Sequence, residues 1–320
     1  MSASSARIPN PESRPPLHER GVAVLVALVV LAIAASLSTA MLWDRNLDVH
    51  RTANILHLDQ AREYLLGAAD WAEQILRRDA QHSQTDSLGE NWATQLPALP
   101  VQGGALTGEL IDLQGLFNVN SLVAANGKTN PEALAQFERL LAVLQINPAI
   151  ASAVADWIDV DAAPHRPAGA EDGYYAGLEV PYLAANQPLA SVSELLLIKG
   201  ITYPVYQRLL PFVAALPATN LRININTAPW PVIASLAKGI TPAEAQSIVA
   251  QRGPNGFQSV AQFQSLLAER VTTGAIGLAS SYFRLISTAQ IGSSSLTMYS
   301  LLQRGQTGGV TSIRQTLGTL

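Results

Sequence analysis

The sequence predicts an α+β protein with a long N-terminal helix, a small antiparallel sheet and a large inserted all-α domain. Gly21–Trp43 is a run of 23 residues without a charge, and no proline occurs between Pro16 and Pro97. One helix can therefore pass from an apolar part into an amphipathic part. Segments typical of strands lie on both sides of a helical region of about 140 residues, and domains are commonly inserted at surface turns.

Composition limits the classes of function. The chain has 320 residues, of which 48% are hydrophobic and 14% charged, and it has no cysteine. Disulfides, thiol catalysis and cysteine-ligated metals are thereby excluded. Residues 1–21 carry a net charge of +1 and the remainder carries −5. An acidic head binds polyanions poorly, so no nucleic-acid partner is expected.

The N-terminal part predicts a membrane anchor. Residues 1–20 are polar and rich in proline, which is typical of disorder. A helix is expected from near Gly21 to Arg78, and its apolar run exceeds the roughly 20 residues that cross a bilayer. Beyond the run, apolar residues recur at helical spacing, which predicts a face packed on the protein's own head. The residues of this stripe are Leu58, Ala61, Leu65, Ala68, Ala72 and Ile75.

Strands are predicted near both ends of the head. One or two are expected within 106–120, a short one within 222–226, a hairpin over 281–302 and an edge strand at 311–317. Helices are expected over 131–214 and 228–268. The expected divisions are a leader at 1–21, an apolar helical segment at 22–43, a helix with the first strands at 44–121, the first part of the inserted domain at 122–220, a short strand at 221–227, a helical segment at 228–270 and C-terminal strands at 271–320.

A tetrapeptide repeats within the helical region. Lys199–Thr202 and Lys238–Thr241 both read Lys-Gly-Ile-Thr, each between two predicted helices. These segments resemble the helix-hairpin-helix family, which often binds DNA through a Gly-x-Gly turn. Here Thr202 or Thr241 replaces the second glycine, and few basic residues accompany the turns. Structural or protein-docking hairpins are therefore favoured over DNA-binding ones.

Carboxylates gather in one region of the chain. Three aspartates come before a proline- and glycine-rich loop, and a glutamate and an aspartate follow it. Several like charges brought together favour a bound cation. Hard oxygen ligands of this kind suit Ca²⁺, although Pro164 breaks the EF-hand pattern. An acidic, solvated loop is the alternative. The candidate ligands are Asp156, Asp159, Asp161, Glu171 and Asp172.

Signs of catalysis are weak. The five histidines are scattered, and the chain contains no Gly-x-Ser-x-Gly, no His-Glu-x-x-His and no phosphate-binding loop. Neither an enzymatic activity nor a small-molecule substrate is expected.

The N-terminus resembles a type IV prepilin leader, because Arg20-Gly21 precedes an apolar helix. The resemblance implies that a prepilin peptidase cleaves after Gly21 and that Val22 is then N-methylated. Most pilin-like subunits have glutamate at the fifth mature position, where it is thought to meet the amino terminus of the subunit ahead. This position is Val26 here. A subunit without the glutamate is suited to the tip, where no subunit lies ahead.

Most of the chain resembles one pilin-like family, the type II secretion minor pseudopilin K. The matching segments are 51–54, 70–71 with 75–79, 103–104, 112–115, 117–120, 155–159, 169–172, 186, 193–195 and 224–229. The resemblance implies a subunit that caps the pseudopilus tip with minor pseudopilins I and J and supports export of folded proteins across the outer membrane. It further implies a single-pass inner-membrane protein with a periplasmic, calcium-binding head. A bulky inserted domain would clash with a neighbour stacked above it, which also favours the tip. The alternative is a single-span periplasmic receptor or DNA-binding protein that uses its hairpin repeats.

Overall fold

The computed structural model describes residues 17–95, 97–268 and 270–318, in two units comprising 1–57 and 58–320. Of the expected leader, residues 1–16 lie outside the described residues.

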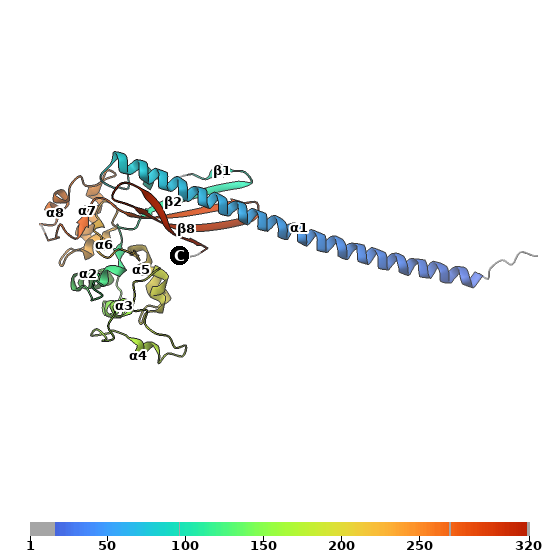
Figure 1. The fold of residues 1–320 in the computed structure, drawn as a ribbon, viewed down its shortest axis with the longest axis horizontal. Coiled ribbons are helices and arrows are strands. Elements are labelled where there is room, and N and C mark those ends of the chain that lie inside the picture. The colour runs from blue at the N-terminus through green and yellow to red at the C-terminus, as the bar shows by residue number, and fades with distance from the viewer. Residues whose placement is uncertain (1–16, 96, 269, 319–320) are drawn as a thin grey trace, which may run out of the picture. The chain divides into compact units, whose positions relative to one another are not determined.

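The first unit consists of the N-terminal part of helix α1, Leu17–His82 (Figure 1). All side chains over 21–50 are exposed, and the helix is long and apolar enough to cross a membrane, with a mean hydropathy of 2.7 over an 18-residue window. The apolar run contains three hydroxyl side chains, those of Ser36, Ser38 and Thr39. Each donates a hydrogen bond of 2.8–2.9 Å to the backbone carbonyl four residues earlier. Their polar groups are thus satisfied within the helix, as a hydrocarbon environment requires. The chain therefore carries an apolar N-terminal helix consistent with a membrane anchor.

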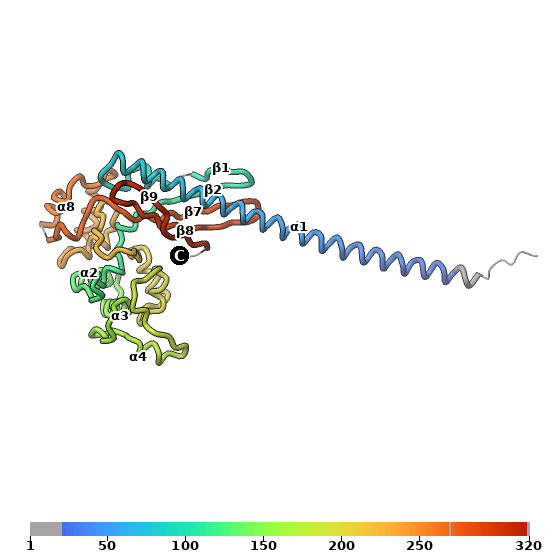
Figure 2. Tube along the Cα trace, viewed as in Figure 1, coloured from blue at the N-terminus to red at the C-terminus, as the bar shows by residue number. Residues whose placement is uncertain are grey.

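The second unit is built on a five-stranded antiparallel sheet in the order β1-β2-β7-β8-β9 (Figure 2). The strands are β1 (Leu99–Val101), β2 (Gly104–Asp112), β7 (Tyr282–Ile291), β8 (Ser294–Arg304) and β9 (Val310–Leu317). The expected C-terminal hairpin and edge strand are confirmed. Strand β2 pairs with β7 along its whole length. Residues 113–281 are thus inserted between two neighbouring strands.

The C-terminal part of α1 packs on one face of this sheet. Ala61, Leu65 and Leu76 are fully buried against Phe283 and Leu302, among others. Burial of one large apolar side chain contributes about 1.5–3 kcal/mol, so this face holds helix and sheet together. The predicted stripe is confirmed over most of its length. Its first member is the exception, since Leu58 remains 41% exposed.

The insertion is mainly helical and has its own apolar core. Its helices are α2 (Pro131–Val143), α3 (Ile150–Ile158), α4 (Asp172–Tyr175), α5 (Tyr203–Leu209), α6 (Trp230–Ser235), α7 (Pro242–Arg252) and α8 (Val260–Leu266). Short 3₁₀ turns are η2 (Val119–Leu122), η3 (Val192–Leu197) and η4 (Leu210–Phe212), and η1 (Asn91–Ala93) precedes the sheet. The insertion also contains two parallel strand pairs, which include the short strand expected within 222–226 and replace the end of the helix expected over 131–214. They are β3 (Phe117–Asn118) with β4 (Val213–Ala214), and β5 (Ile223–Asn224) with β6 (Ile276–Gly277).

Asp112 joins the insertion to the sheet. It ends β2 and is 5% exposed, and its Oδ2 accepts hydrogen bonds from Thr227 and Ser280, both at 2.6 Å, and from Asn224 at 2.9 Å. Its Oδ1 accepts from the Gln114 amide at 2.8 Å. Burial raises the pKa of Asp112, and the hydrogen bonds oppose that rise. One carboxylate thus holds the points where the chain leaves the sheet and returns to it.

The two Lys-Gly-Ile-Thr segments form turns of the same conformation. Gly200 and Gly239 both have φ of +85°, a region that glycine adopts without strain. The turns lie between η3 and α5 and between α6 and α7. Thr241 accepts a hydrogen bond from the Glu244 amide in a capping box that starts α7. The helix-hairpin-helix resemblance itself stays a prediction.

Candidate metal centre

Helix α3 positions the first carboxylates of the acidic cluster. Asp156 is fully buried, and its carboxylate accepts hydrogen bonds from the His165 and Ala170 amides and from the His165 ring Nδ1. Its oxygens are therefore occupied by the loop that follows the helix. A Cβ at Gly169 would lie 2.2 Å from Asp156 Oδ2, so the loop can close around Asp156 only with glycine there.

Three other carboxylates face one another at the end of α3. Asp159, Asp161 and Glu171 offer oxygens that all lie within 4.8 Å of one another. Asp159 Oδ1 and both Glu171 oxygens are buried without a hydrogen-bond partner. The other oxygen of Asp159 accepts from the Thr129 hydroxyl at 3.0 Å, and Asp161 Oδ1 accepts from the Ala163 amide at 2.9 Å. Burying a carboxylate oxygen without a hydrogen-bond partner costs free energy of folding, and here several such oxygens lie close together.

The electrostatics of this group favour a cation. Burial raises the pKa of Glu171 to about 7, with further contributions from neighbouring carboxylates, Asp156 first. Burial likewise raises the pKa of Asp159. Oxygens on opposite sides of a calcium ion at 2.3–2.6 Å lie about 5 Å apart, which matches the spacing here. The donors, their spacing and their missing partners all fit a hard divalent cation.

The structure separates the five sequence candidates into two groups. Asp159, Asp161 and Glu171 converge with unpaired oxygens. Asp156 also lies within 4.8 Å of Asp159 and His165, but it and Asp172 accept hydrogen bonds from the surrounding backbone. Asp172 begins α4 and accepts from the Ala184 amide at 2.9 Å.

Sequence reasoning missed two neighbours of the cluster, His165 and Thr129. The His165 ring bridges Asp156 and the Thr129 hydroxyl, the latter at 3.1 Å. The position of His165 within the proline- and glycine-rich loop was a usable signal. Thr129 carried none, since it lies 30 residues before Asp159.

A second acidic group differs in having a cation of its own. Asp79, Asp86 and Glu90 lie close together, but Arg304 pairs with Asp86 and lies 3.2 Å from Asp79. Burial raises the pKa of Asp79 to about 7, and the negative charges of Glu90 and Asp86 add to that rise. The guanidinium supplies the positive charge in this group, so a metal is not required there.

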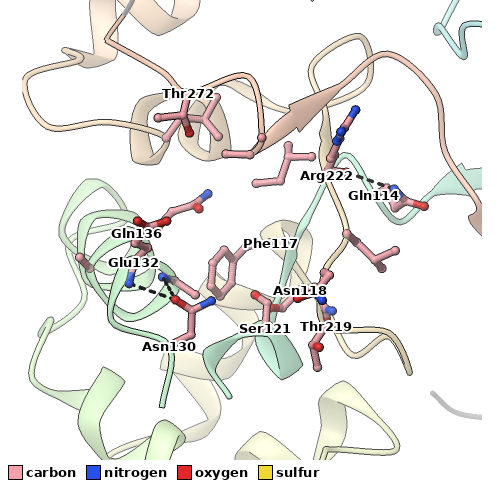
Figure 3. Close-up of a pocket in the computed structure, with 18 of the residues that line it drawn as sticks. Gln114, Phe117, Asn118, Ser121, Asn130, Glu132, Gln136, Thr219, Arg222 and Thr272 are labelled. Carbon is pink, nitrogen blue, oxygen red and sulfur yellow. Dashed lines mark hydrogen bonds between the residues drawn. The ribbon is translucent and has the colours of Figure 1, made fainter. Parts of the chain in front are cut away.

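A polar cleft of about 700 Å³ lies within the insertion (Figure 3). Helix α2 forms one wall, and residues 114–121, 216–223, 236–237 and 270–275 contribute the rest of the lining. The only acidic side chain among its described lining residues is Glu132, and none of those residues is a histidine. The cleft thus offers a polar surface without the acid-base pairs that catalysis commonly uses.

Comparisons with known proteins agree with this architecture. Residues 115–218 and 223–277 match models of the family described as type II secretion system protein K. The chain is 37% identical over 315 residues to type II secretion system protein K of Pseudomonas aeruginosa, covering 94% of this chain and 93% of the relative. Its counterpart in Klebsiella pneumoniae is 36% identical over 315 residues, covering 92% and 95%.

One solved structure has the same fold. It is the GspK chain in the crystal structure of the GspK-GspI-GspJ complex from the enterotoxigenic Escherichia coli type 2 secretion system. That protein is 29% identical in sequence, with a TM-score of 0.75 over 84% of this chain and all of the solved chain. The long apolar helix, the sheet with its large insertion and the extent of these matches lead to one conclusion: the chain belongs to the type II secretion system protein K family.

Proposed function

We propose that this chain caps the tip of the type II secretion pseudopilus and supports export of folded proteins across the outer membrane. The observation that carries the proposal is Val26, an exposed apolar residue of α1 at the position where most pilin-like subunits have glutamate. A subunit that lacks this carboxylate lacks the group that would meet a subunit ahead. The inserted residues 113–281 add bulk that suits a position without a neighbour above.

The partners in this proposal are minor pseudopilins I and J. The supporting comparison is the solved GspK-GspI-GspJ complex, in which the match covers the whole GspK chain and 84% of this protein. The proposal includes cleavage by a prepilin peptidase after Gly21, N-methylation of Val22, an inner-membrane anchor and a periplasmic head. The apolar helix supports the anchor. Family membership favours this function over the receptor or DNA-binding alternative.

Calcium is part of the same proposal. Asp159, Asp161 and Glu171 would hold the ion, which would supply the positive charge that their unpaired oxygens lack. Asp156 and Asp172 would order the loop and the start of α4 around them.

The test of the tip position is co-expression with prepilin peptidase and minor pseudopilins I and J, followed by purification and immunogold labelling of assembled pseudopili. A stable complex with label confined to filament ends is expected. Label distributed along the filaments would refute the tip position. Failure to co-purify with I and J would refute the partner assignment.

A further inference from the structure

The sheet face turned away from α1 carries two arginines in one row. Arg284 of β7 is paired with Leu301 of β8, and Leu301 is paired with Arg314 of β9. Side chains directly opposite one another point to the same face, and successive ones alternate. Phe283 and Leu302 pack toward α1, so Arg284 and its row point the other way.

The two arginines line a pocket of about 210 Å³ between the sheet and the insertion. Val192 and Ala214 line it from the insertion, and Leu301 lines it from the sheet. No other charged residue lies among its described lining residues. The pocket is therefore lined by apolar and hydroxyl side chains, with two guanidinium groups as its charges.

Neither guanidinium has a hydrogen-bond or ion-pair partner among residues 17–95, 97–268 and 270–318, and Arg284 Nε is buried. Burial lowers the pKa of Arg284, whereas Tyr299 and Glu109 raise it. Glu109 lies on the neighbouring strand but forms no ion pair with Arg284. The α carbons of Arg284 and Arg314 are two strand spacings apart, roughly 10 Å, so their long side chains can reach a shared anion. Without an anion, two like charges border one apolar pocket.

We propose that this pocket binds the carboxylate of an acidic side chain from a protein partner. Guanidinium groups bind carboxylates through paired, charge-assisted hydrogen bonds, and the apolar walls suit the methylene groups of such a side chain. The volume admits one side chain and excludes a large ligand. Tyr299 of the pocket lining and Ile286 on the same face are only half-buried, so a docked protein would find apolar surface there. The edge strand β9 would offer it unpaired backbone groups. The inference depends on the pocket and not on the tip position.

The test is an NMR titration of the full-length protein in detergent micelles, with ¹⁵N-labelled arginine. The Nε–Hε signal of Arg284, assigned by its loss in Arg284→Lys, reports on the pocket directly. The probes are the blocked tripeptide acetyl-Gly-Glu-Gly-amide, its glutamine counterpart and inorganic phosphate. The variants are Arg314→Gln and, as a matched control, Arg222→Gln, which changes an exposed arginine in the separate polar cleft.

The glutamate tripeptide should shift the Arg284 signal saturably, and the glutamine tripeptide should not. Arg314→Gln should weaken that binding about tenfold, while Arg222→Gln should leave it unchanged. Equal or tighter binding of phosphate would overturn the assignment to a protein carboxylate and indicate a site for free anions. Absence of a saturable shift with the glutamate tripeptide, in a protein whose spectrum is otherwise native, would overturn the pocket's role.

Discussion

The Thr227 hydroxyl donates a hydrogen bond of 2.6 Å to the Asp112 carboxylate, across 115 positions of the chain. Asp112 belongs to the sheet, and Thr227 lies just after β5 of the insertion. The segments around these residues, 112–115 and 224–229, are therefore the two sides of one buried junction.

Loss of this hydrogen bond should destabilise the head. Thr227→Val keeps the shape of the side chain but removes one donor to a buried carboxylate, so unfolding should become easier by about 1–3 kcal/mol. Urea unfolding of the full-length protein in detergent, followed by tryptophan fluorescence, measures the change. Thr107→Val alters an exposed threonine of β2 and should stay within about 0.5 kcal/mol of the wild type. Equal stability of the two variants would show that the junction contributes little.

Stability should depend on pH through Asp79. The pKa of this carboxyl is about 7 in the folded protein and ordinarily 3.8, so the folded state holds a proton that the unfolded state releases. That contribution is fully present below about pH 4 and is lost as pH rises to about 7, above which it is level. Melting temperatures across this range should fall with rising pH. Asp79→Asn should flatten the fall, and an unchanged profile in this variant would assign the dependence to another group.

Chelation should lower the melting temperature of the head if calcium is bound. At a calcium concentration about 100 times the Kd, the ion adds about 2.7 kcal/mol, which corresponds to a shift of several degrees. The double variant Asp159→Ala, Asp161→Ala should lose the response to EDTA. Glu132→Gln, which removes an acid from the separate cleft, should retain it. A double variant that still responds would place the ion elsewhere.

Cleavage should require Gly21. Co-expression with a prepilin peptidase should yield a chain that begins at N-methylated Val22, as read by intact mass and N-terminal sequencing. Gly21→Leu should leave the precursor uncut and stop secretion. Gly67→Ala is the matched control, because Gly67 is an exposed helical glycine with no atom near its missing Cβ. Normal processing of Gly21→Leu would refute the leader assignment.

Much of the fold could be predicted because it depends on local patterns. The α1 stripe, the hairpin around Gly292 and the bracketed helical region each follow from residue spacing within one segment. Strands β4 and β6 and their pairing with β3 and β5 could not be predicted this way, since each strand has two residues and its partner is distant. A strand of two residues is too short to show an alternating pattern of apolar and polar side chains.

The acidic cluster could likewise be predicted only in part. Its carboxylates were evident as a concentration of charge, but sequence could not tell which oxygens the loop backbone satisfies. Asp156 is saturated by amides of residues 165 and 170, whereas Glu171 is left without partners. That difference is a matter of loop conformation, which no spacing rule encodes. The placement of Arg284 and Arg314 on either side of Leu301 depends on strand register across β8, which the sequence likewise does not reveal.

The pairing of β2 with β7 determines the order in which the head can fold. As the chain is synthesised, β2 has only β1 beside it until β7 is complete, and an isolated two-stranded hairpin is marginal in water. The α1 stripe has no complete sheet to cover it during that time. The insertion has its own core and ends before β7 begins, so it can fold first and bring Asp112 and Phe283 together. This topology allows the head to assemble from the middle of the chain outward, with its first and last segments joining at the end.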